Sequence, residues 1–258
     1  MSKIIAIANQ KGGVGKTTTA VNLSACIAEK GKKVLLIDVD PQGNSTSGLG
    51  IDKNNIEYSA YDVLINGVDA KKAVISTMIE TLDIIAANID LVGAEVELVS
   101  RIAREQILKQ AIKPLRNDYD FIFMDCPPSL GLITLNALTA ADKILVPIQC
   151  EYYALEGLSQ LINTIKLVKT NLNHSLEVEG VVLTMFDGRT NLSIQVVDEV
   201  KKYFKNKVYK TIIPRNVRLG EAPSFGLPVI RYDAACLGTQ CYNDLANEII
   251  EYNEGGET

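Results

Sequence analysis

Hydrophobic residues occur along this chain in two alternating patterns. Short, nearly continuous runs rich in Ile, Val and Leu alternate with longer segments whose apolar residues recur at helical spacing. Short apolar runs of this kind are typical of strands that helices cover on both faces. We expect strands at residues 4–8, 34–38, 82–86, 121–125, 144–148, 178–184 and 208–213.

The longer amphipathic segments predict the helices between these strands. They cover residues 16–30, 92–116, 131–140, 155–172, 192–204 and 238–252. We expect Gly31 to end the first helix in a left-handed cap, and a break near Ser100 in the second. This alternation predicts an α/β fold with a doubly wound, mostly parallel sheet and helices on both faces. Because no linker or repeat divides the sequence, we expect a single domain over residues 1–258.

Composition narrows the class of protein. The 258 residues are 47% hydrophobic and 22% charged, and no apolar run is long enough for a membrane span, so we expect a cytoplasmic protein. The five cysteines are scattered in apolar segments and the only histidine, His174, lies in a polar connector. Buried reduced thiols are therefore favoured over a metal cluster, and a histidine-based triad is not indicated.

A Gly-rich segment at residues 11–18 joins the first predicted strand to the first helix. It reads Lys11-Gly12-Gly13-Val14-Gly15-Lys16-Thr17-Thr18. Glycines allow backbone N–H groups to turn toward phosphate oxygens, and the helix N-terminus adds partial positive charge. We expect the segment to bind a nucleoside triphosphate, with Lys16 at the β- and γ-phosphates and the Thr17 hydroxyl on Mg²⁺.

The segment departs from the general phosphate loop at one position. Gln10 stands where a glycine is usual, and Lys11 follows it. The segment resembles the deviant phosphate-loop ATPases, whose signature is Lys-Gly-Gly-x-Gly-Lys-Thr-[Ser/Thr]. The resemblance implies that two ATP-bound subunits pack face to face and that Lys11 reaches the nucleotide of the partner. A cation delivered in this way would couple hydrolysis to dimerisation. By analogy with arginine fingers, it would accelerate hydrolysis by at most roughly 10³–10⁵-fold.

Three carboxylates follow predicted strands. Asp38 and Asp40 end the second strand and precede Pro41 and Gly43, while Asp125 ends an apolar strand in the manner of a Walker-B acid. The alternative for Asp38 and Asp40 is that they form a solvated strand end without a ligand. The resemblance implies that Asp40 positions or activates the attacking water, and that Asp38 and Asp125 lie at the Mg²⁺ ion.

Further motifs resemble the ParA/Soj family of DNA-partitioning ATPases, and they lie in the expected order over nearly the whole chain. They are Asp38-Val-Asp40-Pro-Gln-Gly-Asn44, Asp125-Cys-Pro-Pro-Ser-Leu-Gly131, Gln149-Cys-Glu-Tyr-Tyr-Ala-Leu-Glu-Gly157 and Ile213-Pro-Arg-Asn-Val-Arg218. The resemblance implies an ATP-dependent homodimer that binds double-stranded DNA without sequence preference and associates with the nucleoid. It also implies a ParB/Spo0J-type partner that stimulates hydrolysis, and a nucleotide base near Met185, Pro214, Arg215 and Asn216. Whether Arg215 serves the base or DNA stays open.

The distribution of charge bears on DNA binding. The whole chain has a net charge of −5, but residues 189–218 contain eight basic and only two acidic residues. A local patch of this size can bind DNA phosphates although the whole chain is acidic. We expect contacts from Arg189 and Arg218, and from Lys201, Lys202 and Lys205. The alternative for the three lysines is an ordinary solvated helix face.

Two other functions compete with this hypothesis. A MinD-like membrane switch needs a basic amphipathic helix near the C-terminus, whereas residues 243–258 are acidic. A metabolic enzyme built on the same ATPase fold needs a further set of catalytic residues, or cysteines that ligate an iron–sulfur cluster. The sequence shows neither.

Overall fold

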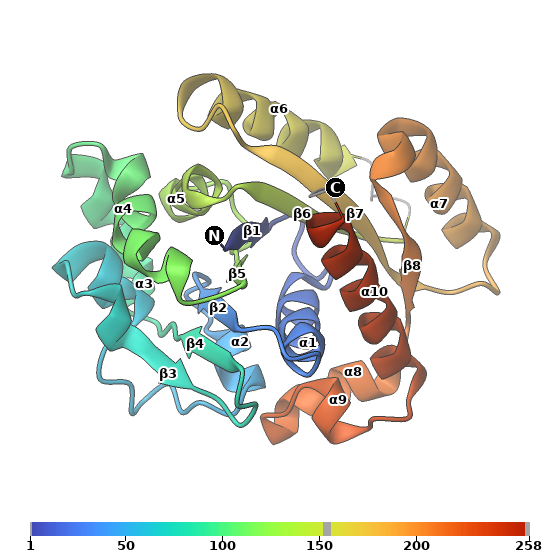
Figure 1. Ribbon diagram of the computed structural model, residues 1–258. Helices are drawn as coiled ribbons and strands as arrows, with labels where there is room; N and C mark the ends of the chain where they lie inside the picture. The colour runs from blue at the N-terminus through green and yellow to red at the C-terminus, as the bar shows by residue number, and fades with distance from the viewer. Residues whose placement is uncertain (1, 152–155, 256–258) are drawn as a thin grey trace.

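The computed structural model describes residues 2–151 and 156–255, and eight strands in these residues form one sheet (Figure 1). The sheet order is β3-β4-β2-β5-β1-β6-β7-β8, and every pairing is parallel except that of β3 with β4. The strands are β1 (Lys3–Ile7), β2 (Val34–Asp38), β3 (Val74–Ser76), β4 (Leu82–Ile85), β5 (Phe121–Asp125), β6 (Lys143–Gln149), β7 (Glu177–Phe186) and β8 (Val208–Pro214). The predicted mostly parallel, doubly wound fold is confirmed.

Helices cover both faces of the sheet and bury a separate core on each. They are α1 (Lys16–Ala28), α2 (Asn44–Gly48), α3 (Leu91–Glu97), α4 (Ile107–Ile112), α5 (Leu132–Ala140), α6 (Glu156–Asn171), α7 (Asn191–Phe204), α8 (Val217–Glu221), α9 (Val229–Tyr232) and α10 (Leu237–Glu254). Figure 1 shows α5 and α6 on one side of the sheet, and α1 and α10 on the other. One core includes Leu91, Leu138 and Val200, and the other includes Leu23, Tyr242 and Leu245. Central strands such as β2 and β5 are buried throughout, which explains their unbroken apolar sequences.

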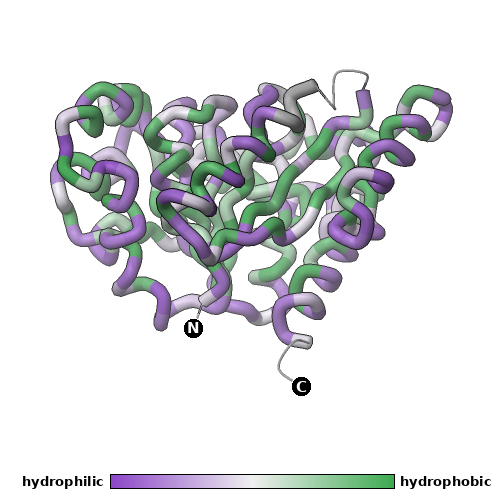
Figure 2. Tube along the Cα trace, turned by 90° about the horizontal axis from the view of Figure 1, so that it is seen from above, coloured by the Kyte–Doolittle hydropathy of each residue, from purple (hydrophilic) through white to green (hydrophobic). Residues whose placement is uncertain are grey.

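The hydropathy of the chain follows these layers. In Figure 2 the hydrophobic stretches run through the middle of the molecule. No helix among the described residues is long and apolar enough to cross a membrane.

The predicted helices are confirmed with small shifts at their ends, with one exception. The expected helix at residues 92–116 consists of α3, α4 and short 3₁₀ turns, and the chain becomes extended at Arg101, next to the expected break at Ser100. Gly31 adopts the expected left-handed conformation, with φ of 82°, just after α1. Strand β3 and helices α2, α8 and α9 were not predicted, because each has only three to five residues and too few positions to show a period.

Parallel strands bring their carboxyl ends to one edge of the sheet. The segments that follow β1, β2, β5, β7 and β8 therefore meet at this edge, which we call the nucleotide edge. Helix α7 leads away from it: α7 starts after β7 at the nucleotide edge and ends shortly before β8 begins at the opposite edge.

Candidate nucleotide site

The Gly-rich segment forms a rigid loop between β1 and α1. Thr184 at the end of β7 donates its hydroxyl to the Val14 carbonyl at 2.8 Å, and Asn9 donates its side-chain amide to the Pro147 carbonyl at 2.8 Å. Gly15 has φ of 86°, a conformation that a residue with a Cβ rarely adopts. The loop is thus held from the neighbouring strands, with the N-terminus of α1 directly behind it.

Lys16 is buried although it is charged. It is 6% exposed, and its Nζ donates to the Lys11 carbonyl at 3.1 Å. Burial lowers the pKa of Lys16, while the nearby Asp125, Cys126 and Asp40 act in the opposite direction. A buried ammonium on a phosphate loop is poised for an anionic ligand, because a phosphate would restore the stabilisation that water no longer provides.

Lys11 and Gly12, at the start of this loop, are both accessible to solvent. Gly12 is exposed, and a Cβ built on it would meet only Pro128, at an ordinary contact distance of 3.9 Å. Within the described chain, the Lys11 ammonium has no ion pair, while the Lys11 carbonyl accepts from Lys16. The backbone of Lys11 therefore belongs to the loop, while its charge is available to a group outside this subunit.

Asp38 and Asp125 lie side by side. They are cross-strand partners at the carboxyl ends of β2 and β5, and both are 0% exposed. Asp38 accepts hydrogen bonds from Thr46 N at 2.9 Å, Thr46 Oγ1 at 2.8 Å and Asp40 N at 3.1 Å. Asp125 Oδ2 accepts from Ser45 Oγ at 2.8 Å, while its Oδ1 has no hydrogen-bond partner within the described chain.

These contacts separate the roles of the two acids. Both oxygens of Asp38 are engaged by the loop and by α2, so Asp38 stabilises the segment that carries Asp40 and Ser45. Burial raises the pKa of Asp125, and repulsion from Asp38 raises it further, while the Ser45 and Thr17 hydroxyls act in the opposite direction. Burial also raises the pKa of Asp38. A buried, unpartnered carboxylate oxygen beside a second acid and a threonine hydroxyl is a donor set that suits Mg²⁺.

Asp40 lies beyond the end of β2, and its charge acts on Lys16 and Asp125. It is 7% exposed, and its Oδ1 accepts from Gln42 N at 3.0 Å. The second carboxylate oxygen of Asp40 accepts no hydrogen bond from the described residues, so it is available to hold a water molecule beside the phosphate loop.

A small pocket of about 190 Å³ lies beside the loop, between the ends of β7 and β8. Gly15 and Thr18 form one side, and all four residues predicted to contact the base line it: Met185, Pro214, Arg215 and Asn216. Sequence reasoning missed the other lining residues, which are Thr184, Ile213, Leu219, Gly220 and Tyr242. Met185 has φ of 52°, in the left-handed region, so the end of β7 is strained where it borders the pocket.

Comparison with known proteins agrees with this geometry. A family model described as "AAA domain" matches residues 2–178. The sporulation initiation inhibitor protein Soj of Bacillus subtilis is 61% identical over 249 residues, which cover 96% of this chain and 98% of the relative. The chromosome partitioning protein ParA of Myxococcus xanthus is 54% identical over 251 residues, covering 97% of this chain and 89% of the relative. The chain belongs to the ParA/Soj family of ATPases.

A solved structure supports the fold of this ParA/Soj protein over its whole length. Cobyrinic acid a,c-diamide synthase from Mycobacterium smegmatis, with bound ADP and magnesium, superposes with a TM-score of 0.87. It is 37% identical and covers 100% of this chain and 97% of that chain. This fold therefore occurs in a solved structure that contains bound ADP and magnesium.

The predicted DNA-binding residues of this ParA/Soj protein do not form one cluster. Arg189 follows β7 and Arg218 follows β8, so both lie at the nucleotide edge. Lys201 and Lys202 lie in the last turn of α7 and Lys205 follows it, so the lysines lie toward the opposite edge. At 1.5 Å per residue, the 14 residues of α7 separate the two groups by roughly 20 Å.

Each arginine of the basic segment pairs with a carboxylate that lies outside residues 189–218. Arg189 Nη2 lies 2.7 Å from Asp187 Oδ2, and Arg215 Nη2 lies 2.7 Å from Glu151 Oε1. Arg218 pairs with Glu221 at 2.8 Å and with Asp233 at 3.3 Å. The charge counted along the sequence therefore overstates the local charge at the nucleotide edge.

Glu95 is a further residue near the site that sequence reasoning missed. Its carboxylate accepts from Leu132 N at 2.8 Å and from Ile133 N at 3.2 Å, at the start of α5. A Cβ on Gly131 would come within 2.4 Å of this carboxylate, so Gly131 makes room for it. Glu95 thus anchors the end of the loop that follows Asp125. The contact spans 37 residues of sequence, and no local pattern predicts it.

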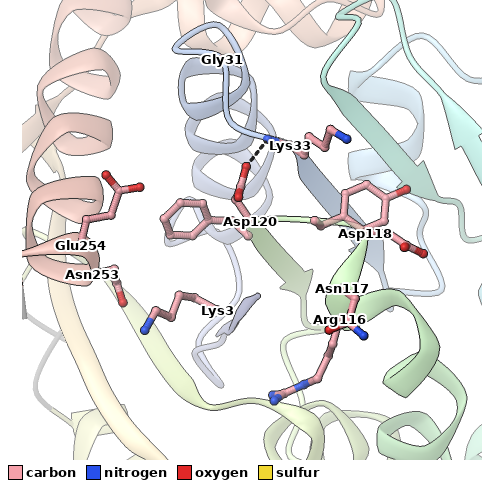
Figure 3. A pocket seen from close by; sticks show the side chains of 11 residues that line it. Lys3, Gly31, Lys33, Arg116, Asn117, Asp118, Asp120, Asn253 and Glu254 are labelled. Atoms are coloured by element: carbon pink, nitrogen blue, oxygen red, sulfur yellow. Dashed lines mark hydrogen bonds between the residues drawn. The ribbon is translucent and has the colours of Figure 1, made fainter. Parts of the chain in front are cut away.

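A larger cleft, of about 750 Å³, lies at the opposite edge of the sheet (Figure 3). Cations and carboxylates are mixed in its lining, and in Figure 3 the side chains of Lys3 and Lys33 point in different directions. Asp120, also in this lining, accepts from Lys33 N at 2.8 Å. No predicted site residue lines this cleft, and its charged groups do not converge on a common point.

Proposed function

We propose that this protein is an ATP-dependent dimerising switch that binds DNA without sequence preference in chromosome or plasmid partitioning. ATP and Mg²⁺ would occupy the site that residues 11–18 form with the strand-end carboxylates. Hydrolysis would end the DNA-bound state, and a ParB/Spo0J-type partner would stimulate it. Association with the nucleoid follows from DNA binding.

We propose a role in hydrolysis for each group of the site. The loop amides and Lys16 would hold the phosphates, and Thr17 and Asp125 would hold Mg²⁺, whose charge stabilises the developing charge on the phosphate oxygens. Asp40 would orient the attacking water. Asp38 acts as a positioning residue, because its oxygens are already engaged by Thr46 and Asp40 N.

Dimerisation would complete this site. The Lys11 ammonium has no ion pair within the described chain, and Gly12 is exposed and carries no side chain. A second copy facing the loop could therefore approach closely and receive Lys11 at its nucleotide. Charge neutralisation in trans would then make hydrolysis depend on assembly.

One observation carries the link to DNA: the base pocket and the arginines share the same strand ends. Met185 lines the pocket and Arg189 follows four residues later, while Pro214 lines it and Arg218 follows four residues later. Arg215 N donates to the Phe186 carbonyl at 3.1 Å and joins the two segments. Occupation of the pocket and the placement of these arginines are therefore coupled through short pieces of backbone.

Arg189→Ala tests this proposal. We expect the variant to dimerise with ATP, as seen by light scattering, and to lose retention of a random-sequence duplex. A fall in ATP affinity would instead assign Arg189 to the nucleotide site. Normal DNA retention by Arg189→Ala would contradict the proposed contact.

The MinD-like membrane alternative is disfavoured by α10. This helix contains no lysine or arginine, and its acids Asp244, Glu248, Glu251 and Glu254 would be repelled by an anionic lipid surface. Four of its apolar residues are already buried in the core with α1: Tyr242, Leu245, Ala246 and Ile249. ATP-dependent sedimentation with liposomes would revive this alternative.

The resemblance to a cobyrinic acid a,c-diamide synthase structure raises a metabolic alternative. No group of three or more His, Cys, Asp or Glu side chains in the described residues could hold an additional metal ion. ATP turnover that requires a small acid and an amide donor would favour this alternative, whereas turnover stimulated by DNA and a ParB-type partner would favour ours.

A further inference from the structure

The pairing of Arg189 with Asp187 has the geometry of a bound anion. Arg189 Nε donates to Asp187 Oδ1 at 2.8 Å, and Arg189 Nη2 donates to Asp187 Oδ2 at 2.7 Å. A guanidinium recognises a phosphate with the same pair of parallel N–H donors. The carboxylate of Asp187 therefore occupies the position on Arg189 that a DNA phosphate would take.

The arrangement is preorganised by the backbone. Asp187 Oδ1 also accepts from Arg189 N at 3.1 Å, in a turn that leads to Thr190. Thr190 caps α7 through the Ser193 amide, so the turn is fixed to the start of the helix. The Arg189 side chain is 89% exposed, whereas that of Asp187 is 23% exposed. The acid is thus held in place while the arginine faces solvent.

Asp187 also lies in the field of a second arginine. Arg189 first, and Arg215 to a smaller extent, hold the pKa of Asp187 at about 2, so it is ionised at any physiological pH. Glu151 pairs with Arg215, and Glu221 and Asp233 pair with Arg218. An intramolecular carboxylate at each arginine is a recurring feature of the nucleotide edge.

We propose that Asp187 competes with DNA phosphate for Arg189, and so limits the DNA affinity of each subunit. This inference rests on the proposed DNA-binding function and adds a regulatory element to it. Binding would require the carboxylate to give up Arg189, and the released carboxylate would then repel nearby phosphates. Weak contacts in each subunit would make stable binding depend on the two copies of the surface that a dimer presents.

Asp187→Asn removes the charge and keeps the acceptor oxygen of the turn. Asp198→Asn is the matched control, because it makes the same charge change on α7, where Asp198 is exposed and has no ion pair with an arginine among the described residues. Both variants would be loaded with ATP, checked for dimerisation by light scattering, and titrated with a random-sequence duplex at several salt concentrations. If the amide variant fails to dimerise, Asp187→Ser supplies a shorter neutral acceptor at the same position.

We expect Asp187→Asn to bind DNA roughly three- to tenfold more tightly than wild type at about 0.1 M salt, and more tightly than Asp198→Asn. In an Arg189→Ala background the advantage of Asp187→Asn over Asp198→Asn should shrink, because the competing pair is gone and only the repulsion between the Asp187 carboxylate and phosphate is left to remove. If Asp187→Asn matches Asp198→Asn in the wild-type background, the competition is refuted while the DNA-binding function stands. If wild type with ATP binds no duplex at all, the proposed function and this inference both fail.

Discussion

Asp125 is the residue whose environment depends most on a bound cation. It is fully buried beside Asp38, and one of its oxygens has no hydrogen-bond partner among the described residues. Ionising both of two adjacent buried carboxylates costs free energy, because burial and mutual repulsion disfavour the second charge. A divalent cation would remove this cost, so the geometry proposed to hold Mg²⁺ should destabilise the protein in the absence of the ion.

Asp125→Asn should therefore stabilise the nucleotide-free protein while it abolishes Mg²⁺-dependent hydrolysis. At low pH Asp125 is protonated in both the folded and the unfolded chain, so the wild-type cost is absent. The cost grows as pH rises above the ordinary Asp pKa, because the unfolded chain ionises while burial keeps the folded Asp125 protonated, and it is complete above the raised pKa. We expect a gain of about 1–2 kcal/mol at pH 8, or roughly 2–4 °C in Tm, and little gain at about pH 4. Thermal unfolding in EDTA at both pH values measures this. A lower Tm at pH 8 would contradict the account.

At the residue scale, the sequence predicted the candidate site residues but not the side chains that hold them in place. Lys16, Thr17 and Asp125 were identified because a phosphate loop and a strand-ending acid are local patterns. Ser45 and Thr184 hydrogen-bond to Asp125 and to the Val14 carbonyl from distant parts of the chain. Only the parallel sheet brings them together, so their roles could not be predicted from spacing. The roles of the predicted site residues themselves stay predictions.

Among the elements, α5 depends on a contact from α3. The first four backbone N–H groups of a helix have no acceptor within the helix. Glu95 accepts from two of them in α5, those of Leu132 and Ile133. The negative charge also lies favourably at the positive end of the helix dipole. This capping fixes the loop between Asp125 and α5.

Removal of this cap should destabilise the fold locally. Glu95→Ala should lower the free energy of unfolding by about 1–2 kcal/mol, because two amides lose a charged acceptor. Glu97→Ala is the control on the same helix, since among the described residues Glu97 accepts only from the Tyr61 hydroxyl, at 2.9 Å, and caps no helix. Urea unfolding of both variants measures the difference. Equal stabilities of the two variants would show that the cap contributes nothing.

The two ends of α7 should differ in their contribution to DNA binding. Arg189 and Arg218 lie at the edge where the nucleotide acts, whereas Lys201 and Lys202 lie toward the opposite edge and Lys202 already pairs with Glu199 at 2.7 Å. Arg189→Ala with Arg218→Ala should weaken ATP-dependent DNA binding at least tenfold, and Lys201→Ala with Lys202→Ala by less than threefold. Fluorescence anisotropy on one duplex compares the pairs. A larger effect of the lysine pair would move the surface to the opposite edge.

At the element scale, the long periodic segments were predictable and the short ones were not. The central strands and α1, α5, α6, α7 and α10 have enough residues to display a period. The charge count along the sequence did not predict that the basic residues are separated, because it ignores that α7 leads from one edge of the sheet toward the other. It also ignored Asp187 and Glu221, which lie just outside the counted segment and pair with its arginines.

For the whole molecule, electrostatics should set the response of DNA binding to salt. The chain is acidic overall, so binding must come from a local surface that is doubled in the dimer. If four to six phosphates are contacted per dimer, log K should fall with log salt at a slope of roughly −4 to −5. Titrations at several salt concentrations give this slope. A flat response would refute the electrostatic contact.

The face-to-face dimer also predicts the effect of a substitution on the outer side of the loop. Gly12→Val should leave the monomer folded, since Gly12 is exposed, lies outside the left-handed region and has space for a Cβ. It should block dimerisation, because the added methyl groups would stand between the two loops. Light scattering with ATP tests the dimer, and retained nucleotide binding shows that the loop is intact. A dimer of normal affinity would place the interface elsewhere.

The family and the fold are established for the molecule as a whole, and its assembly is the central proposal. Asp40→Ala removes the carboxylate that would orient water and leaves Lys11 and the outer face of the loop unchanged. Light scattering of this variant with ATP, with and without DNA, tests the proposal most directly. We predict a stable dimer of twice the mass of one chain, retained on duplex DNA and absent without nucleotide. A variant that binds ATP and stays monomeric would contradict the claim that a second copy of this chain completes the site.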